Sequence, residues 1–283
     1  MDVAFIGLGR MGAPMARRLA GAGHRVRGHD LLPRELEGVI AAASAADAAT
    51  GADAVVLMLP SSADVHWVAV ENGVLEAMDA HTTLIDMSSS EPMATRELAE
   101  AAGTRGIDLV DAPVSGGVPR ATNGTLTIMA GGNDAAVGRV RPLLETMGSR
   151  VLHVGPVGAG HALKALNNLL SATHLLATAE AVAIGRRFGL DPKIMIEVIN
   201  TSSGASASTD IKYPNYILNQ AFNSGFGARL MVKDIGIAVG LGEELEVPAT
   251  LGERTLELWR EAAEALPADA DHTEIARWVD ARY

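Results

Sequence analysis

Short apolar runs alternate with longer segments of helical periodicity over the first half of this 283-residue chain. The runs are rich in valine, isoleucine and leucine, which is typical of buried β-strands. They predict strands at 3–6, 25–28, 54–59, 83–86, 108–111, 126–130 and 151–154, and helices at 11–19, 62–70, 91–102 and 135–147. This alternation predicts an α/β fold, with a doubly wound, mostly parallel sheet covered by helices on both faces.

Beyond residue 158 the pattern changes, because we find only apolar residues at helical spacing and no convincing strand. One long helix is expected over 161–188, then helices over 192–199, 230–245, 248–265 and 273–281, with a loop at 201–208. Asp191 and Pro192 suit the N-cap and the first position of a helix. The chain therefore divides into a predicted α/β domain, 1–158, and an all-helical domain, 159–283.

The first predicted strand leads directly into a G-x-G-x-x-G motif, Gly7-Leu8-Gly9-Arg10-Met11-Gly12. In such a strand–turn–helix unit the first glycine allows a tight turn, the second lets phosphate approach, and the third lets helix pack on strand. The unpaired N–H groups at the helix start favour a pyrophosphate. With 30 glycines in the chain the motif alone is weak evidence, but its setting indicates a dinucleotide site.

The second predicted strand leads to Asp30, 18 residues after Gly12. A carboxylate at this place accepts hydrogen bonds from a ribose diol and repels a 2′-phosphate, which favours NAD over NADP. Two alternatives stay open: Asp30 only begins a turn, or Arg27, close by in the sequence, reaches a 2′-phosphate.

Composition narrows the classes of function. A net charge of −11, from 23 Lys and Arg against 34 Asp and Glu, argues against a nucleic-acid partner. The absence of cysteine excludes disulfides, thiolate metal sites and cysteine nucleophiles, and is compatible with a cytoplasmic location. The histidines lack metal-site spacing, and no stretch approaches the roughly 18 apolar residues of a membrane span, so neither a metal nor a membrane partner is expected. The strand that starts at the N-terminus leaves no room for a signal peptide.

Lys164 is the only formally charged side chain between Val151 and Ala179. Apolar surroundings disfavour an ammonium ion and lower the pKa of the amine, so that proton transfer near neutral pH becomes feasible. Asn168 lies four residues later on the same helix face, with Ser171 further along. The amine and the amide together could hold one hydroxyl or carbonyl oxygen. The alternative is a lysine that extends from the helix end to solvent.

Polar or glycine residues follow several predicted strands, where doubly wound sheets bind ligands. Ser115, Gly116 and Gly117 offer a hydroxyl and backbone N–H groups that suit a small carboxylate, although a plain glycine-rich turn is equally compatible. Arg120 could add charge there or face solvent. Ser115 sits in no G-x-S-x-G elbow, which argues against a hydrolase. Two other strands end in Leu59-Pro60-Ser61-Ser62 and Ser88-Ser89-Ser90-Glu91, where Ser90 could be only a helix N-cap.

These motifs together resemble the β-hydroxyacid dehydrogenase family, which includes 3-hydroxyisobutyrate and tartronate semialdehyde dehydrogenases. The resemblance covers nearly the whole chain and rests on GLGRMGAPMA at 7–16, DAPVSGG at 111–117, GAGHALKALNN at 158–168 and Lys233-Asp234. It implies an N-terminal Rossmann domain, a helical C-terminal domain and a long connecting helix that carries the catalytic lysine. It also implies a homodimer or homotetramer formed through the helical domains.

The resemblance implies a role for each matching residue. Lys164 would be the general acid and base, Asn168 would assist it, and Ser115, Gly116 and Gly117 would bind the substrate carboxylate. Cofactor contacts are implied at Leu59, Pro60, Asp64, Ser89 and Lys233, besides the glycine motif and Asp30. Without the resemblance, Lys233 and Asp234 would be interpreted as a solvated pair of charges on a helix. Asp64 and Ser89 stand where many members have asparagine and threonine, and Arg18 replaces a frequent asparagine. The segment 206–219 departs from the hydroxyisobutyrate subgroup, although 201–204 resembles it.

The expected activity is reversible hydride transfer between the nicotinamide of NAD and the hydroxyl carbon of a small, anionic 3-hydroxy acid. A tartronate semialdehyde reductase, or a reductase of a related aldehyde acid, is the nearest alternative. An imine reductase shares the architecture but generally lacks the lysine and prefers NADP. A nucleotide-binding regulator without turnover would keep the glycines but has no need of a buried lysine.

Overall fold

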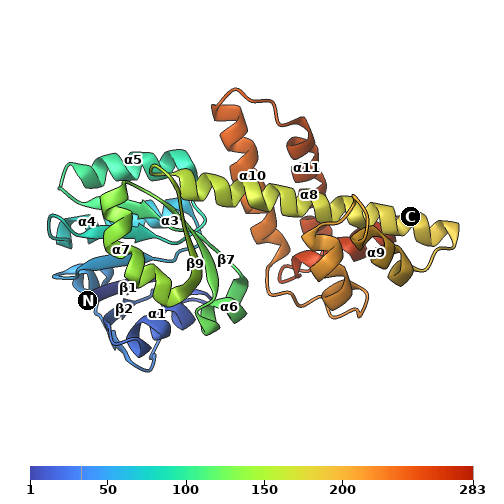
Figure 1. Ribbon diagram of the computed structural model, residues 1–283. Coiled ribbons are helices and arrows are strands. Elements are labelled where there is room, and N and C mark those ends of the chain that lie inside the picture. Colours follow the sequence, from blue (N-terminus) through green and yellow to red (C-terminus); the bar gives the residue numbers. More distant parts are fainter. Residues whose placement is uncertain (33, 283) are drawn as a thin grey trace. The chain divides into compact units, whose positions relative to one another are not determined.

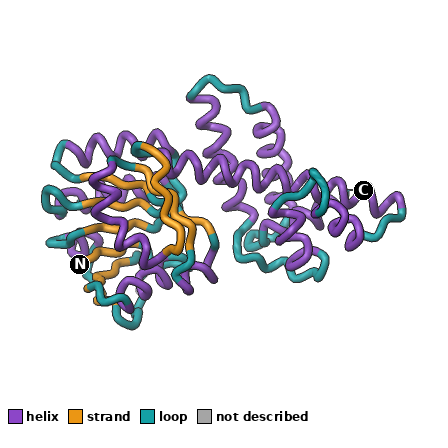
Figure 2. The backbone as a smooth tube through the Cα atoms, in the orientation of Figure 1, coloured by secondary structure: helices purple, strands orange, loops and turns teal. Residues whose placement is uncertain are grey.

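The computed structural model describes residues 1–32 and 34–282. The chain divides into two compact units, Met1–Lys164 and Ala165–Tyr283. Among the described residues, every named strand belongs to the first unit, whereas helices and loops make up the second (Figure 2).

The first unit is built on one twisted sheet. Its strands lie in the order β3 (Val39–Ala41), β2 (Arg25–His29), β1 (Asp2–Ile6), β4 (Ala54–Leu57), β5 (Thr83–Asp86), β6 (Asp108–Asp111), β8 (Leu126–Gly131) and β7 (Val114–Ser115), with β9 (Gly148–Gly155) beside β8. All neighbouring pairs are parallel except β8 with β6 and β8 with β7. The predicted fold class, a doubly wound and mostly parallel sheet, is confirmed.

Helices cover both faces of this sheet (Figure 1). One layer holds α1 (Gly12–Gly21), α6 (Gly117–Asn123) and α7 (Asp134–Met147); the other holds α2 (Ala45–Ala49), α3 (Ser62–His66), the π-helical η1 (Trp67–Glu71), α4 (Val74–Ala77) and α5 (Pro92–Gly103). Successive strand residues face opposite sides, so Val3 and Phe5 enter the first core while Ala4 and Ile6 enter the second. Two apolar layers therefore hold the strands, and their loops are left for binding.

Several short elements of the first unit escaped the sequence pattern. Strand β3 is a half-exposed strand of three residues, and β7 has only two, too few to show a period. Helix α6 contains Gly117 and Pro119, which are poor helix formers, and α2 has only five residues.

The second unit packs around the apolar stripe of one long helix. Helix α8 (Ala159–Phe188) begins in the first unit and continues through the second. It is followed by α9 (Pro192–Asn200), the π-helical η2 (Ser208–Ile217), α10 (Ala228–Glu244), α11 (Thr250–Ala265), η3 (His272–Glu274) and α12 (Ile275–Ala281). Leu175 and Leu176 of α8 pack in one core with Trp259 and Tyr213. The η2 turn was not predicted, because Pro214 interrupts its pattern.

Candidate active site

The carboxyl ends of five neighbouring parallel strands lie in register at one edge of the sheet. Their pairing partners form a single row, His29–Ile6–Leu57–Asp86–Asp111. The loops that follow β2, β1, β4, β5 and β6 must therefore leave the sheet side by side. Ligands of doubly wound sheets bind at this edge.

Each glycine of the G-x-G-x-x-G motif meets a different steric demand. Gly7 has a φ of +94°, and a Cβ there would lie 2.3 Å from the carbonyl oxygen of Met58. A Cβ on Gly12 would lie 1.9 Å from the carbonyl oxygen of Gly7, so only glycine lets α1 approach the strand so closely. A Cβ on Gly9 would meet nothing within 4 Å. The space beside Gly9 is thus open for a pyrophosphate, as a dinucleotide site requires.

The start of α1 is suited to an anion. Its N-cap is Met11, whose side chain makes no capping hydrogen bond, so that no side chain competes with a ligand for the first N–H groups. Leu8 is buried and donates its N–H to Asp30 Oδ2 at 2.7 Å, while Arg10 is exposed at the tip of the loop. The residues present therefore fit a dinucleotide.

Asp30 and Arg27 have separate tasks at the end of β2. Asp30 is partly exposed and accepts N–H groups from Leu8 and, through Oδ1, from Leu32 at 2.9 Å. It thus begins a turn, as one interpretation proposed, and its carboxylate also lies beside the glycine loop. The guanidinium of Arg27 donates to the carbonyl oxygens of Asp47 and Thr50 in and after α2, so it is held away from any role with a 2′-phosphate.

The loops after β4 and β5 are joined by hydrogen bonds. Leu59 donates its N–H to Ser88 Oγ at 2.9 Å, and Glu91 donates its N–H to Ser62 Oγ at 2.8 Å. Pro60 is exposed, and Ser89 is half-buried between the buried Ser88 and Ser90.

Two side chains in these loops are oriented by their neighbours. Asp64 accepts the hydroxyl of Ser61, the N-cap of α3, at 2.5 Å. Ser90 donates to Asp86 Oδ2 at 2.7 Å, and α5 takes Glu91 as its N-cap. The interpretation of Ser90 as an N-cap is therefore wrong, because its hydroxyl is engaged by a buried carboxylate.

Ser115 ends β7, beside Thr127 of β8, and is half-buried. Gly116 and Gly117 follow with φ values of +134° and +66° at the start of α6. A Cβ on Gly116 would lie 2.4 Å from Cδ of Arg120, because the Arg120 side chain folds back over the loop while remaining exposed. The three residues form a short, partly exposed loop with a hydroxyl and two amides.

The first turn of α8 is anchored at the same sheet edge. The buried carboxylate of Asp111, the last residue of β6, accepts N–H groups from Gly158 at 2.8 Å and from His161 at 2.9 Å. The ring of His161 is fully buried, 2.8 Å from Thr95 Oγ1 and 3.7 Å from Asp86 Oδ2. Local spacing could not predict this anchoring role of Asp86, Asp111 and His161, since the hydrogen-bonded partners lie 47 to 66 residues apart in the sequence.

Lys164 follows His161 by one turn of α8 and is only 8 % exposed. Its side chain therefore does not extend into solvent, contrary to the alternative interpretation. An ammonium group with this little exposure is costly unless polar groups surround it, and such lysines are typical of catalytic sites.

Asn168 is held by a buried carboxylate on α10. Its Nδ2 donates to Asp234 Oδ2 at 2.5 Å, and Asp234 is 2 % exposed. Lys233 Nζ lies 3.8 Å from Asp234 Oδ1. Lys233 and Asp234 are thus no solvated pair, because the aspartate is buried to orient Asn168. This link over 66 residues could not be read from local spacing.

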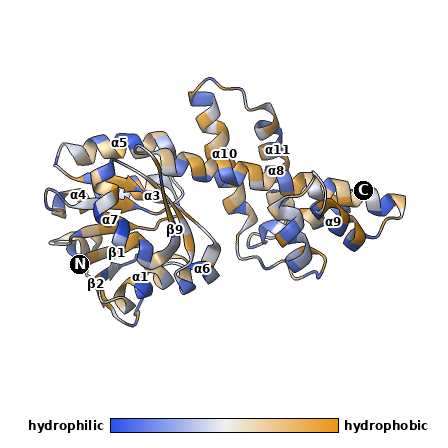
Figure 3. Ribbon diagram, in the orientation of Figure 1, coloured by the Kyte–Doolittle hydropathy of each residue, from blue (hydrophilic) through white to orange (hydrophobic). Residues whose placement is uncertain are grey.

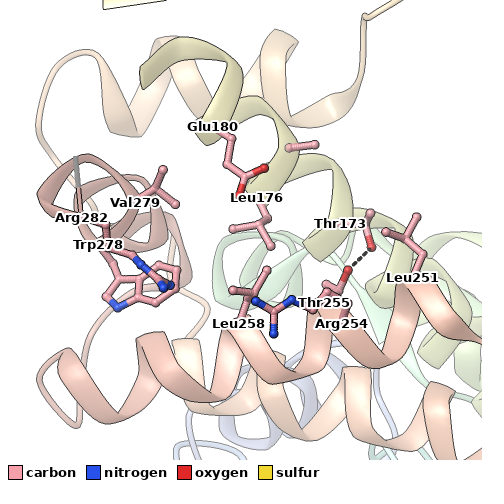
Figure 4. Close-up of a pocket in the computed structure, with 11 residues that line it drawn as sticks. Thr173, Leu176, Glu180, Leu251, Arg254, Thr255, Leu258, Trp278, Val279 and Arg282 are labelled. Atoms are coloured by element: carbon pink, nitrogen blue, oxygen red, sulfur yellow. Dashed lines mark hydrogen bonds between the residues drawn. The ribbon is translucent and has the colours of Figure 1, made fainter. Parts of the chain in front are cut away.

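A pocket of about 380 Å³ lies elsewhere in the second unit (Figure 4). It is bordered by α8, α11 and α12, with Trp278 and Arg282 on one side and the Thr173–Thr255 hydrogen bond on another. None of the predicted site residues lines it. It is therefore separate from the candidate chemistry.

Comparison with known proteins assigns both halves of the chain. The model of the NAD binding domain of 6-phosphogluconate dehydrogenase matches residues 2–155. The model described as NAD-binding of NADP-dependent 3-hydroxyisobutyrate dehydrogenase matches residues 158–279. The chain belongs to the β-hydroxyacid dehydrogenase family. The family assignment and the NAD-binding domain support NAD as the cofactor, and they make the protein an NAD-dependent hydroxyacid dehydrogenase.

Relatives of this dehydrogenase act on several hydroxy acids. The chain is 37 % identical to an NAD-dependent L-serine dehydrogenase of Pseudomonas aeruginosa, over 99 % of this chain and 98 % of that one. It is 40 % identical to a 2-(hydroxymethyl)glutarate dehydrogenase of Eubacterium barkeri, over 88 % and 84 %. A 3-hydroxyisobutyrate dehydrogenase from Mycobacterium tuberculosis, solved with L-serine, superposes with a TM-score of 0.93 at 35 % identity, with 98 % of each chain covered.

Two physical features complete the description of the dehydrogenase. Over residues 1–32 and 34–282, no helix combines the length and apolar character needed to cross a membrane. In the same part of the chain, no group of three or more His, Asp and Glu side chains is arranged to hold a metal ion.

Proposed function

We propose that this dehydrogenase oxidises the primary hydroxyl of a small 3-hydroxy acid resembling 3-hydroxyisobutyrate, with Lys164 as general acid and base. The burial of Lys164 on α8, just after a helix start that Asp111 anchors at the sheet edge, carries this proposal. Reduction of tartronate semialdehyde or a related aldehyde acid is the alternative direction of the same chemistry.

Each of the proposed site residues has a defined task in this mechanism. Ser115 and the amides of Gly116 and Gly117 bind the substrate carboxylate and so set the position of the reacting carbon. Bound NAD supplies the hydride acceptor. Lys164 Nζ accepts the hydroxyl proton during oxidation and returns it during reduction, when its charged form also stabilises negative charge on the oxygen. Asn168 keeps one amide hydrogen on Asp234 and directs the other to the substrate oxygen.

Other assignments stay proposals that rest on the family resemblance. Leu59, Pro60, Asp64, Ser89 and Lys233 would contact NAD, together with the glycine loop and Asp30. The first domain would bind the cofactor, and the helical domain would bind substrate and mediate oligomerisation. The cytoplasmic location likewise stays a prediction.

A panel of hydroxy acids tests the proposed activity. Purified protein is mixed with NAD or NADP and with 3-hydroxyisobutyrate, glycerate, L-serine, threonate and 3-hydroxypropionate, while NADH or NADPH absorbance is followed. We expect turnover with NAD and at least one of the 3-hydroxy acids. Absence of turnover with every acid, in a protein that binds NAD, would contradict the proposal.

Replacing Asp30 by alanine is expected to weaken the preference for NAD. Loss of charge-assisted hydrogen bonds to the ribose diol, and of repulsion toward a 2′-phosphate, should lower the ratio of kcat/KM for NAD over NADP about 10- to 100-fold. Arg27→Met is the matched control and should leave this ratio unchanged, because α2 holds the Arg27 guanidinium. A large change of this kcat/KM ratio in Arg27→Met, with none in Asp30→Ala, would show that Arg27 and not Asp30 sets the cofactor preference.

We also propose that the protein is a homodimer or homotetramer formed through the helical domain. Large apolar side chains are exposed at the end of α8 and on α9, including Phe188 at 84 %, Ile184 at 71 % and Ile194 at 60 %. Hydrophobic residues mark these helices in Figure 3. Exposed apolar surface of this kind is typical of an interface.

Light scattering after size exclusion tests the assembly. We expect a mass of two or four times the 29.4 kDa of one chain. The double substitution of Ile184 and Phe188 by glutamate should reduce this mass to that of a monomer, whereas Ala101→Glu, on the exposed side of α5, should not. A monomeric wild-type protein would refute the proposed assembly.

A further inference from the structure

A second lysine reaches the face of α8 that carries the proposed catalytic residues. Lys164, Asn168 and Ser171 are spaced by four and three residues, so they form one stripe along α8. Lys212 lies on η2, 41 residues after Ser171, and its Nζ donates a hydrogen bond of 2.8 Å to Ser171 Oγ. An amine from a distant segment thus continues the stripe, although the proposed mechanism gives it no task.

The charge of Lys212 is not neutralised by an ion pair. In the part of the chain that the structure describes, its Nζ has no carboxylate at ion-pair distance, and the side chain is half-buried. Burial lowers the pKa of Lys212 to about 8, against the raising effect of Asp271. The amine therefore stays mostly charged near neutral pH. A half-buried charge of this kind disfavours folding unless a ligand or solvent compensates it.

Asp271 is unsuited to be the partner of Lys212, because donors of its own surround it. Its carboxylate accepts the hydroxyls of Ser224 and Thr273 at 2.6 to 2.9 Å and backbone N–H groups of Gly225, Phe226 and Thr273. Burial would raise the pKa of Asp271, yet hydrogen bonds, including those from His272 and Thr273, hold it well below its usual value. The Asp271 carboxylate therefore joins the loop that precedes α10 to the start of η3. Lys212 remains available for an external anion.

Helix geometry places this amine within reach of a substrate. With a rise of about 1.5 Å per residue, Ser171 lies about 4.5 Å beyond Asn168 along α8. If the substrate oxygen lies between Lys164 and Asn168 and one branch of the substrate runs along the stripe, a short carbon chain is enough to cover the distance to Ser171. An acidic group two or three carbons further along that branch would reach Ser171 and Lys212.

We propose that Lys212 and Ser171 form a recognition site for a second anionic group on the substrate, borne by the carbon next to the hydroxyl carbon. The favoured substrates are 3-hydroxy acids with an acidic side chain, either carboxylate or sulfonate. A 2-ammonium group, as in L-serine, is disfavoured by like charge. This inference rests on the proposed function, because Lys164 and Asn168 must hold the reacting oxygen.

The test compares acids that differ at this position. Rates are measured with saturating NAD for 2-(hydroxymethyl)glutarate, a sulfonated analogue, 3-hydroxyisobutyrate and L-serine. We expect wild-type protein to prefer one of the two dianions. Lys212→Met should lower kcat/KM for that dianion about 10- to 100-fold, chiefly through KM, and change kcat/KM for 3-hydroxyisobutyrate less than about threefold. Lys212→Arg, which keeps the charge, should restore much of the preference.

Matched variants separate recognition from a structural role. Arg260→Met removes an exposed cation of α11 and should leave every rate unchanged. An equal fall for all acids in Lys212→Met, or a wild-type preference for L-serine or 3-hydroxyisobutyrate, would overturn the proposed recognition site.

Failure of the proposed function would look different from failure of this inference. If wild-type protein oxidises no acid, calorimetric binding of 2-(hydroxymethyl)glutarate in the presence of NAD decides the question. Binding to wild type that is lost in Lys212→Met would support the recognition site alone, and equal or absent binding to both would refute it.

Discussion

Lys164→Met should lower kcat about 10²- to 10⁴-fold, the contribution that a positioned general acid or base makes to proton transfer. Methionine keeps an unbranched side chain of similar length, so the buried position of Lys164 on α8 stays filled. The start of this helix is anchored by the Asp111 carboxylate, which accepts the backbone N–H groups of Gly158 and His161, and the substitution keeps these groups. The loss should therefore appear in turnover rather than in folding or in NAD binding.

Stopped-flow absorbance of NADH formation checks this expectation, together with calorimetric titration of NAD. Arg260→Met, which likewise replaces a cationic side chain but at an exposed position of α11, is the control and should keep wild-type rates. Turnover of Lys164→Met near the wild-type level, with NAD binding unchanged, would exclude Lys164 as the proton acceptor.

Gly12→Ala should destabilise the first unit and abolish measurable NAD binding. The added methyl group would lie 1.9 Å from the carbonyl oxygen of Gly7, a backbone atom that cannot turn aside. Overpacking of this kind costs about 3 kcal/mol or more, because α1 must shift away from the strand. Thermal and urea unfolding of the apo protein measure the loss.

Gly9→Ala, compared with Gly12→Ala, separates an effect on NAD binding from an effect on stability. No atom lies within 4 Å of the added carbon, so the apo protein should keep its melting temperature. The methyl group would instead occupy the space proposed for the pyrophosphate, and the Kd for NAD should rise about tenfold or more. Equal stability of the two apo variants, or unchanged NAD affinity in Gly9→Ala, would refute the proposed geometry of the loop.

Local patterns sufficed to predict most of the fold. The apolar runs gave the strands of the sheet apart from β3 and β7, because buried parallel strands need continuous apolar residues. The glycine motif could be recognised from the sequence because it belongs to one strand–turn–helix unit. Close backbone contacts at Gly7 and Gly12 leave no room for a side chain there. The apolar sequence around Lys164 left open whether its side chain is buried or extends to solvent, and only the structure shows it buried.

The partners of the candidate site residues could not be predicted in this way. Asn168 is oriented by Asp234, and Ser171 is bonded to Lys212, through contacts between segments far apart in the sequence. Arg27 is held by carbonyl oxygens in and after α2, a helix too short to be seen in the pattern. Such partners are set by tertiary packing, which cannot be predicted from the periodicity of the sequence.

Chemical rescue of Lys164→Ala tests the role of Lys164 most directly. Truncation leaves room at a buried position for small primary amines, which are added to the variant with NAD and the preferred acid. If Lys164 is the proton acceptor, the restored rate rises with amine concentration and, among amines of similar size, follows their basicity. A variant that no amine rescues, or rescue that tracks amine size and ignores basicity, would contradict the assignment of Lys164 as the general base.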